Sequence, residues 1–402
     1  MKEILFLAHR IPYPPDRGDR MRSWHLLRHL GRYAKVHLAA FTELDSDDGH
    51  VAAMREAMGE GLGEVHLERR VHDNLKWALR ALWRREPIVN AAFYSRAMRD
   101  FAQRIAAERP IEAVVAFSFQ MAQYVPSGPR FIMDFCDVDS AKFADYAKED
   151  RWLHWAVHKH EAIRVRALER DIARRADLSL FVTEAETALF RAQAGAIDAD
   201  VRPLSNGIDL AYYDPKAGFA RLDPPPAGPL LVFTGQMSYR PNVEGVTAFA
   251  DKVMPLVRRA LPEAGFAIVG RDPAAEVQAL ADRPGIVVTG EVPDVRPWLA
   301  AAAVVVAPLA IARGVQNKVL EAMAMARPVV ASPGAFCGID AEPGRDLIVA
   351  GDDGEQAEAI LALIADPKRA AAMGKAGRRR MVEAYSWDAR LAPLAEMAGL
   401  AA

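Results

Sequence analysis

The chain has 402 residues, of which 51% are hydrophobic, and its formal net charge is −2. This length favours two domains over one core, and the near-neutral charge excludes a general nucleic-acid-binding protein, which needs a sustained excess of Lys and Arg. The only cysteines are Cys136 and Cys337, with no Cys/His cluster of metal-ligand spacing, which excludes a disulfide framework and a structural zinc site.

The same features predict a cytoplasmic protein, either soluble or peripheral on the inner face of the plasma membrane. The N-terminal "KEILFLAHR" has too short an apolar core for a signal peptide. The longest apolar run, Leu299 to Ala312, is interrupted by Pro308 and is shorter than the roughly 20 residues of a membrane-spanning helix.

Short β-branched runs alternate with helical patterns in both halves of the chain, which is typical of parallel sheets covered on both faces. Strands are predicted in the first half at Ile4–Ala8, Val36–Ala40, Val65–Leu67, Ala113–Phe117, Phe131–Asp134 and Leu178–Val182. In the second half they are predicted at Leu230–Thr234, Phe266–Val269, Ile286–Thr289, Val304–Ala307, Val329–Ala331 and Leu347–Val349. The fold class is therefore α/β, with two Rossmann-like, doubly wound domains.

A Pro-rich stretch at 223–229 separates the two halves and predicts a semi-rigid linker. The N-terminal domain is expected at 1–222 and the C-terminal domain at 230–385. A last helix is expected to begin at about Ser386. Two such domains are expected to face each other across a cleft into which strand C-termini and helix N-termini point.

The loop after the first strand, "HRIPYPPDRGDR", is stiffened by three prolines and carries Gly18, which allows backbone to approach a ligand closely. We expect this loop to form one wall of the cleft through His9, Gly18, Asp19 and Arg20, although a plain surface turn is the alternative.

Two basic segments rich in tryptophan lie further along the first half, at Lys76–Arg85 and Arg151–Lys159. They suit interfacial helices that contact anionic lipid. Tryptophans packed on the core beside solvated arginines are the alternative.

The stretch from Arg313 to Ser332 is the most informative of the chain: a glycine-containing loop, a short helix with Lys318 and Glu321, and a β-branched strand. Exposed amides at a helix start suit a phosphate, and a carboxylate one turn further accepts hydrogen bonds from two sugar hydroxyls. The segment therefore predicts a site for a nucleoside diphosphate, built from Arg313, Gly314, Val315, Gln316, Asn317, Lys318 and Glu321.

"KVLEAMAMARPVVAS" closely resembles the donor-binding element of the GT-B-fold retaining glycosyltransferases of family 4, also called group 1 glycosyltransferases. The loop "HRIPYPPDRGDRMR" resembles the narrower group of sugar transferases associated with exopolysaccharide and bacterial protein-sorting (PEP-CTERM) systems. This resemblance implies transfer of a sugar from a nucleotide diphosphate sugar to a glycan or lipid-linked acceptor, without cofactor or obligatory metal. It also implies that the last helix, 386–402, crosses back onto the N-terminal domain.

By the same resemblance, Glu321 holds the ribose, the Gly290–Val292 loop meets the base, and Asp137 faces the donor sugar. The chain departs from the family pattern at four positions. Arg313 replaces a second glutamate, Asp19 replaces the second glycine of the first loop, and Gln236 and Asn242 stand where many members have Arg and Lys. We then expect Lys318, Arg240 and Arg313 to supply the charge that neutralises the diphosphate. Gly235, which ends a strand, is expected at the same donor site.

Three alternatives remain open. The Asp137–Asp139 "DVD" also matches the DxD of metal-dependent GT-A transferases, and three-residue matches of this kind are common by chance. A sugar-nucleotide epimerase on the same architecture would consume donor without an acceptor. A degenerate GT-B module would bind a sugar nucleotide or a partner without turnover.

Overall fold

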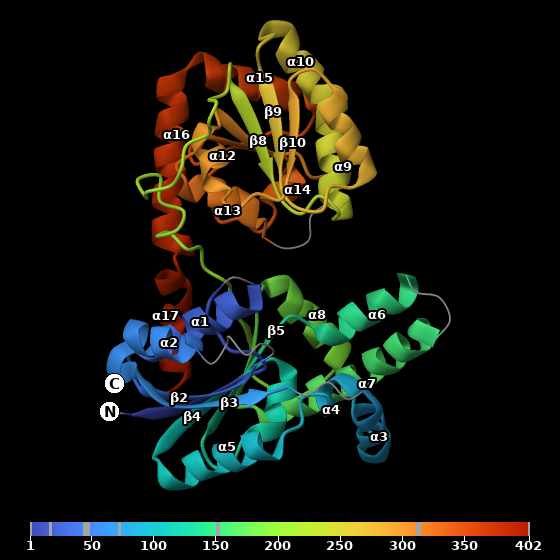
Figure 1. Cartoon of the computed structure of the whole chain (residues 1–402), viewed down its shortest axis with the longest axis vertical. Coiled ribbons are helices and arrows are strands. Elements are labelled where there is room, and N and C mark those ends of the chain that lie inside the picture. Colours follow the sequence, from blue (N-terminus) through green and yellow to red (C-terminus); the bar gives the residue numbers. More distant parts are fainter. Residues whose placement is uncertain are drawn as a thin grey trace. The chain divides into compact units, whose positions relative to one another are not determined.

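A computed structural model describes residues 2–15, 18–42, 49–70, 74–149, 153–310 and 315–400. The chain divides into two compact units (Figure 1). Unit 1 comprises Met1–Asn206 and Arg390–Ala402, and unit 2 comprises Gly207–Ala389.

Unit 1 is built on a seven-stranded parallel sheet with the order β3-β2-β1-β4-β5-β6-β7. Its strands are β1 Glu3–Ala8, β2 Lys35–Thr42, β3 Leu62–Arg69, β4 Ile111–Phe117, β5 Arg130–Cys136, β6 Leu178–Phe181 and β7 Val201–Pro203. Its helices are α1 Gly18–Leu30, α2 His50–Met58, α3 Asn74–Arg84, α4 Ile88–Ala91, α5 Arg96–Glu108, α6 Asp139–Glu149, α7 Leu153–Arg175 and α8 Glu184–Ala194. Helices α1 and α5 lie on opposite faces of the sheet (Figure 1), so the central strands are buried on both sides.

Unit 2 has a six-stranded parallel sheet with the order β10-β9-β8-β11-β12-β13. Its strands are β8 Leu230–Thr234, β9 Gly265–Val269, β10 Ile286–Gly290, β11 Val304–Ala307, β12 Val329–Ala331 and β13 Ile348–Val349. Its helices are α9 Arg240–Ala248, α10 Met254–Ala260, α11 Ala275–Gln278, α12 Arg296–Ala301, α13 Asn317–Ala324, α14 Pro333–Phe336, α15 Asp353–Ala365 and α16 Pro367–Arg380.

The predicted strands are all present, and the prediction of two Rossmann-like parallel sheets is confirmed. Strand β7 was not predicted. It has only three residues, with Arg202 in the middle and Pro203 at the end, so it lacks the β-branched run that marks the other strands.

The boundary between the units lies at Asn206/Gly207, before the expected end of the first domain at 222. The reason is that the chain already packs on unit 2 from Gly207 onward. The Ile208 amide donates to the Tyr385 carbonyl at 2.7 Å, and Ile208 belongs to the core of unit 2. Phe219 and Leu222 pack on the same core, so the segment before the Pro-rich stretch belongs to unit 2.

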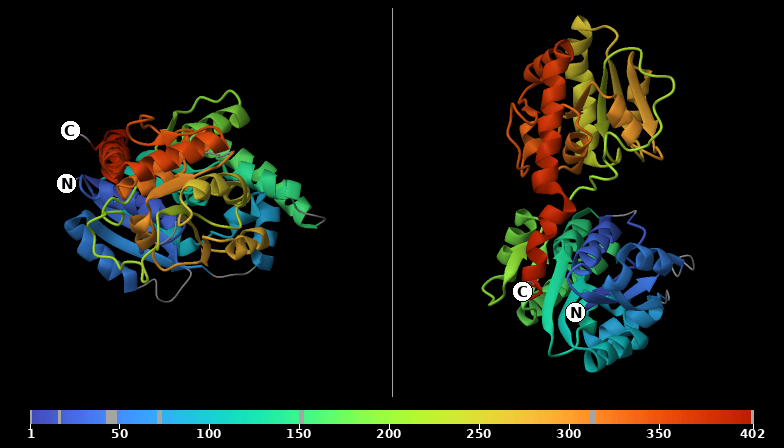
Figure 2. Two further views of the ribbon diagram at one scale, coloured as in Figure 1. Left: turned by 90° about the horizontal axis from the view of Figure 1, so that it is seen from above. Right: turned by 90° about the vertical axis from the view of Figure 1, so that its left-hand side faces the viewer.

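The last helix, α17 Trp387–Met397, continues from unit 2 into unit 1, to which residues from Arg390 onward belong. The return therefore begins at Arg390, four residues after the expected Ser386, because Ser386 pairs with Ile208 in unit 2. Near the chain ends, the Lys2 ammonium donates to the Gly399 carbonyl at 2.8 Å, and both ends of the chain lie in unit 1 (Figure 2).

None of the helices in the described part of the chain combines the length and apolar character that a membrane crossing requires.

Candidate functional site

The order of each sheet reverses between two neighbouring strands, and ligands of open α/β sheets bind where the loops leave the carboxyl ends of those strands. In unit 2 the reversal lies between β8 and β11, and in unit 1 between β1 and β4. The loop from Gly235 and the connection into α13 therefore border one candidate position. The loop from His9 and the Ser118 turn border the other.

In unit 2, Lys318 is the centre of a connected group of polar side chains. Its ammonium donates to Asn242 Oδ1 at 2.7 Å, and Asn242 Nδ2 donates to the Gln236 carbonyl at 2.8 Å. The ammonium also lies 4.8 Å from the centre of the Phe233 ring. A Cβ at Gly235 would lie only 2.9 Å from Asn242 Nδ2, so a larger residue there would disturb the group.

Burial lowers the pKa of Lys318 to about 8, and the Glu321 carboxylate offsets only part of this effect. The half-buried ammonium thus lacks full charge compensation at the start of α13. An anion placed there would restore this compensation and would also meet the positive end of the helix.

Glu321 lies one turn further along α13 and hydrogen-bonds the hydroxyl group of Tyr213. Burial raises the pKa of the Glu321 carboxyl, against the opposing effects of Tyr213 and Lys318. Burial and the nearby Glu321 raise the pKa of Tyr213 as well. Sequence reasoning missed Tyr213, although it lies in the "SNGIDLAYYDP" segment just before the Pro-rich stretch.

The other predicted residues of unit 2 are more dispersed. Arg240 is exposed, and its side chain pairs with Glu244 on the same helix at 2.7 Å. Gly290 has a φ of +68° and open space where a side chain would stand, which suits an approaching ligand. Val292 packs on the core of unit 2.

At the start of α13, Val315 and Gln316 are half-buried and Asn317 is exposed. Gln316 occupies the N-cap position, but its side chain does not cap the helix. The predicted Arg313 and Gly314 lie outside the described residues.

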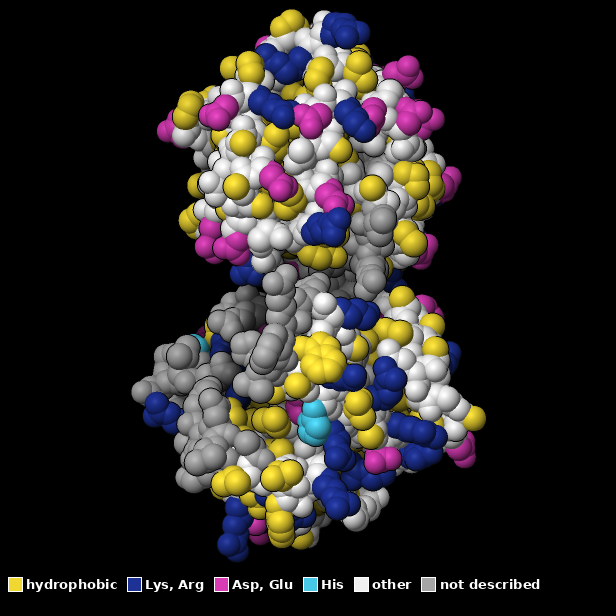
Figure 3. All heavy atoms as spheres, turned by 90° about the vertical axis from the view of Figure 1, so that its right-hand side faces the viewer, with side chains coloured by type: hydrophobic (Ala, Val, Ile, Leu, Met, Phe, Trp, Pro, Cys, Tyr) yellow, Lys and Arg dark blue, Asp and Glu magenta, His cyan; other side chains and the backbone are white. Residues whose placement is uncertain are grey.

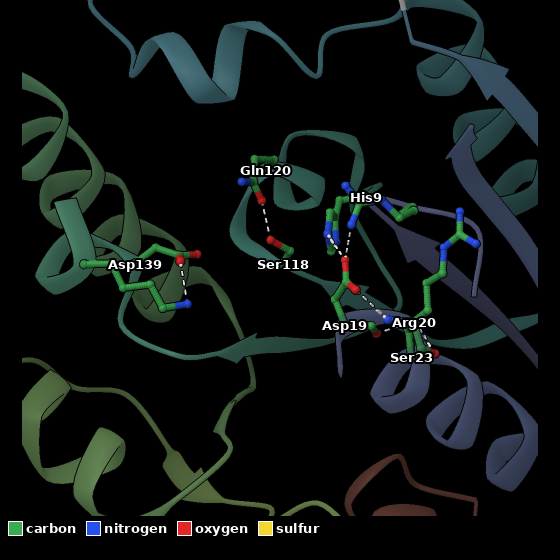
Figure 4. A network of polar contacts seen from close by, with 9 residues as sticks. His9, Asp19, Arg20, Ser23, Ser118, Gln120 and Asp139 are labelled. Carbon is green, nitrogen blue, oxygen red and sulfur yellow. Dashed lines mark hydrogen bonds and ion pairs between the residues drawn. The ribbon is translucent and has the colours of Figure 1, made fainter. Parts of the chain in front are cut away.

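In unit 1, the predicted first loop gathers around Asp19 in the first turn of α1 (Figure 4). The Asp19 carboxylate pairs with Arg10, lies 3.3 Å from His9 Nε2, and accepts the Arg20 amide at 2.9 Å. Burial disfavours its ionised form, but the His9 hydrogen bond and the Arg10 charge outweigh burial and hold the pKa of Asp19 well below its usual range. Asp19 is therefore ionised, and its carboxylate holds His9, Arg10 and the Arg20 amide together.

His9 is held by stacking on Phe117 at 5.6 Å between ring centres, and its buried Nδ1 has no hydrogen-bond partner among the described residues. Gly18 begins α1, and a side chain there would meet nothing within 4 Å. The space beside Gly18 is therefore open, as the close approach of a ligand would require.

The next two strands of this sheet edge end in strained backbone. Ser118 follows β4 with a φ of +73°, and Cys136 ends β5 with a φ of +67°. Non-glycine residues in this region carry strain of about 1 to 3 kcal/mol, and such strain clusters at functional sites. Sequence reasoning did not identify either position, because nothing in their residue types indicates it.

Asp137 and Asp139 follow β5 and share one cation. The Lys142 ammonium donates to Asp137 at 2.7 Å and to Asp139 at 3.2 Å. Burial raises the pKa of Asp139 although Lys142 opposes it. Within the described residues, no group of three or more His, Cys, Asp or Glu side chains is arranged to hold a metal ion.

An unforeseen buried ion pair supports this edge of the sheet. Arg22 of α1 and Asp134 of β5 are both fully buried and are joined by hydrogen bonds of 2.8 to 3.2 Å. Arg22 also donates to the Leu204 carbonyl at 2.8 Å and to Asn206 Oδ1 at 2.7 Å. The pair therefore fixes α1, β5 and the end of unit 1 to one another.

We expect Arg22→Met to destabilise unit 1 by about 3 to 5 kcal/mol, because it leaves the Asp134 charge buried without its partner. Urea unfolding monitored by circular dichroism would measure this loss. The matched control is Arg202→Met, which removes an exposed ion pair with Asp200 and should change stability little. Equal effects of the two substitutions would contradict the structural role of Arg22.

Comparisons with known proteins agree with this architecture. Residues 228–366, which lie in unit 2, match the family model described as "Glycosyl transferases group 1". Alpha-maltose-1-phosphate synthase of Mycolicibacterium smegmatis is 32% identical over 216 residues, which cover 48% of this chain and 55% of that protein. A GDP-mannose-dependent mannosyltransferase acting on phosphatidylinositol monomannoside, from the same organism, is 35% identical over 163 residues, covering 36% and 42% respectively.

The chain spans about half the length of the curated relatives it matches. Solved structures extend the likeness to the whole chain. HepE from Anabaena, in complex with UDP and glucose, has a TM-score of 0.61 at 13% identity, covering 99% of this chain and 100% of that one. Sucrose-phosphate synthase from Thermosynechococcus elongatus also has a TM-score of 0.61, at 16% identity and 99% and 98% coverage. Residues 228–366 are thus similar to the group 1 glycosyltransferases, and the two parallel-sheet units of the chain have the GT-B fold.

Proposed function

We propose that this protein is a retaining glycosyltransferase that moves a sugar from a nucleotide diphosphate sugar to a glycan or lipid-linked acceptor. The observation that carries the proposal is the pairing, on one helix, of the undercompensated Lys318 ammonium with the half-buried Glu321 carboxylate. A cation and a hydroxyl-binding carboxylate one turn apart match the diphosphate and the ribose of such a donor.

In this reaction the bond from the anomeric carbon to the diphosphate oxygen breaks, a glycosidic bond to the acceptor oxygen forms, and the acceptor hydroxyl loses its proton. The leaving diphosphate gains negative charge, which Lys318 and the amides at the start of α13 stabilise. Asp137, which follows β5, stabilises the positive charge that develops on the sugar. The protein otherwise acts by positioning the two substrates.

The departures from the family pattern at Gln236 and Asn242 are compatible with donor binding. Asn242 Oδ1 accepts from the Lys318 ammonium at 2.7 Å, and the Gln236 backbone carbonyl accepts from Asn242 Nδ2 at 2.8 Å. This arrangement supports binding of a donor, and an assay of transfer distinguishes turnover from a degenerate module. Among the relatives, the phosphatidylinositol monomannoside mannosyltransferase is named for a lipid acceptor. We place this protein in exopolysaccharide or cell-surface glycan synthesis, in the cytoplasm and in peripheral contact with the inner face of the plasma membrane.

A thermal-shift screen against UDP-, GDP- and ADP-sugars tests donor binding. A donor at a hundred times its Kd should stabilise the protein by about 2.7 kcal/mol. Incubation of the stabilising donor with and without acceptors then separates the alternatives. Transfer to an acceptor supports the proposal, epimerised donor without acceptor supports an epimerase, and binding without turnover supports a degenerate module.

We predict that transfer survives EDTA, because Lys318 and a helix start serve the diphosphate in place of a metal ion. Asp139→Asn should be tolerated, since Lys142 keeps its bond to Asp137. Asp137→Asn should lower kcat more than donor affinity, because it withdraws charge from an oxocarbenium-like transition state. Loss of activity in EDTA with recovery in Mg²⁺ or Mn²⁺, and equal need for both aspartates, would instead support the DxD interpretation.

A further inference from the structure

The turn that carries Asp137 lies between β5 and α6, and the start of α6 lacks a local cap. The residue before the first residue of α6 is Val138, whose apolar side chain cannot accept a hydrogen bond. The amides at the start of a helix have no partner within that helix, so those of α6 need acceptors from elsewhere. Two glutamates from other helices of unit 1 supply these acceptors.

Glu169 of α7 holds the first turn of α6. Its Oε1 accepts the Ser140 amide at 3.1 Å, and Glu169 is only 1% exposed. Burial raises the pKa of Glu169 to about 7, although hydrogen bonds from Ser140 oppose this effect. The fold thus retains a carboxylate where burial disfavours its charge, which favours a role beyond filling space.

Glu186 of α8 holds the backbone immediately after Asp137. Its Oε2 accepts the Val138 amide at 2.7 Å. Glu186 stands three residues after Thr183, the N-cap of α8, and a glutamate at this position commonly bonds the N-cap amide of its own helix. Here Oε2 reaches the turn before α6, where the positive end of the helix favours a carboxylate.

Asp137 therefore lies in backbone that is fixed on both sides. Its own amide donates to the Phe135 carbonyl at 2.9 Å. Its carboxylate accepts from the Lys142 ammonium at 2.7 Å, and the same ammonium donates to Asp139 at 3.2 Å at the start of α6 (Figure 4). The direction of the Asp137 side chain thus depends on the backbone that the two glutamates hold.

A second buried glutamate of α7 provides a comparison. Glu161 is 3% exposed and accepts the Ile88 and Val89 amides at 2.9 and 3.0 Å, at the start of α4. It caps a helix from the side, as Glu169 does. Helix α4, however, carries none of the candidate-site residues described above.

The outer side of α7 differs in charge from this interior. Figure 3 faces the α6 and α7 side of unit 1 and shows mainly hydrophobic, Lys and Arg side chains there. Of the predicted basic segment, Lys159 is exposed, whereas Arg151 and Trp152 lie outside the described residues. Glu161 and Glu169 are thus directed inward, against the helices that they cap.

We propose that Glu169 and Glu186 are positioning residues for sugar transfer, which fix the direction of the Asp137 carboxylate by holding the Ser140 and Val138 amides. The assignment rests on the proposed function, in which Asp137 stabilises the positive charge on the sugar. Displacement of a reacting group by about 1 Å can cost about a hundredfold in rate. Capping of α6 for stability alone is the alternative, and the comparison with Glu161 separates the two.

The test compares Glu169→Leu, Glu186→Leu and Glu161→Leu in the full chain. The first two should lower kcat of transfer by about 10- to 100-fold and leave the donor KM within about threefold of the parent. Glu161→Leu should leave kcat and KM within about threefold of the parent, although thermal unfolding should show a loss of stability like that of Glu169→Leu, since each removes a buried acceptor.

The conservative variant Glu169→Gln keeps an acceptor oxygen for the Ser140 amide and should restore most of kcat. Glu186 is half-buried, so Glu186→Leu carries the test if Glu169→Leu does not fold. In the Asp137→Asn background, Glu169→Leu should lower kcat much less than in the parent, because both substitutions act through the same side chain.

Hydrogen exchange followed by mass spectrometry gives a readout that does not depend on turnover. Exchange should be faster around Ser140 in Glu169→Leu and around Val138 in Glu186→Leu. Unchanged exchange at the turn would overturn the proposal. So would equal effects of Glu161→Leu and Glu169→Leu on kcat, or equal effects of Glu169→Leu in the two backgrounds.

Failure of the proposed function has a different signature. A parent that transfers no sugar would overturn that function and the role in turnover with it, whereas faster exchange in the variants would still support the two glutamates as the residues that hold the turn. Full activity of Asp137→Asn together with low activity of Glu169→Leu would overturn positioning through Asp137.

Discussion

Replacing Glu321 by alanine is expected to weaken binding of a nucleoside diphosphate by about 30- to 1000-fold, equivalent to about 2 to 4 kcal/mol. The carboxylate is half-buried on α13, and the hydroxyl group of Tyr213 is its hydrogen-bond partner. It is therefore already placed to accept hydrogen bonds from hydroxyl groups, and the ribose of a nucleotide offers two. Isothermal calorimetry with UDP, GDP and ADP measures the effect.

Two further variants test the reason for this loss. Glu321→Gln keeps the shape of the side chain but loses its charge, so its affinity for the nucleoside diphosphate should lie between those of the parent and the alanine variant. Tyr213→Phe should change affinity less, because Tyr213 orients the carboxylate rather than supplying the acceptor atoms. The control Glu358→Ala removes an exposed carboxylate of α15 and should bind like the parent. An alanine variant with affinity within about threefold of the parent would exclude Glu321 from the site.

Strand positions were predictable from the sequence because the central strands are buried on both faces and read as uninterrupted β-branched runs, as in Val304–Ala307. The unit boundary was not predictable from composition. The Pro-rich stretch is a strong local signal, but the division depends on the pairing of Ile208 with Ser386, which are distant in sequence. Sequence patterns also fail to predict short edge strands such as β7, because hydrogen bonds to the neighbouring strand, rather than local residue types, define them.

For the candidate site, the sequence predicted which helices and loops carry the functional residues better than it predicted the contacts between their side chains. Lys318 and Glu321 follow from local pattern, since they stand at the start of a helix after a buried strand. Arg22, Asp134 and Tyr213 do not, because each acts through a partner more than a hundred residues away. Arg240 shows the converse: it lies on the expected loop, but its side chain pairs with Glu244 at 2.7 Å on its own helix.

Lys318→Ala is expected to weaken binding of the nucleoside diphosphate by about 10- to 100-fold and to change binding of the nucleoside alone little. Only the diphosphate loses a charge-assisted hydrogen bond. Calorimetry with each nucleoside and its diphosphate gives the two ratios. Equal weakening of both ligands would mean that Lys318 supports the structure of the site rather than the phosphates. Arg259→Ala, on an exposed part of α10, is the matched control.

The pH dependence of diphosphate affinity shows whether Lys318 contributes through the charge of its ammonium or through the shape of its side chain. Burial lowers the pKa of Lys318 to about 8, so the free protein carries the ammonium below that pH and loses it as pH rises. A bound diphosphate favours the ammonium and raises its pKa. Diphosphate affinity should therefore be constant below about pH 7.5 and fall by up to tenfold per pH unit above 8, with proton uptake on binding.

Lys318→Arg keeps its charge throughout this window, so its affinity for the diphosphate should not change between about pH 7 and 9.5. This range lies above the second phosphate ionisation near 6, so the charge of the phosphate groups changes little across it. Dividing diphosphate affinity by nucleoside affinity at each pH removes any contribution from Glu321, which both ligands share. A parent ratio that stays constant through pH 8, or an arginine variant that falls with the parent, would remove the Lys318 ammonium from the diphosphate site.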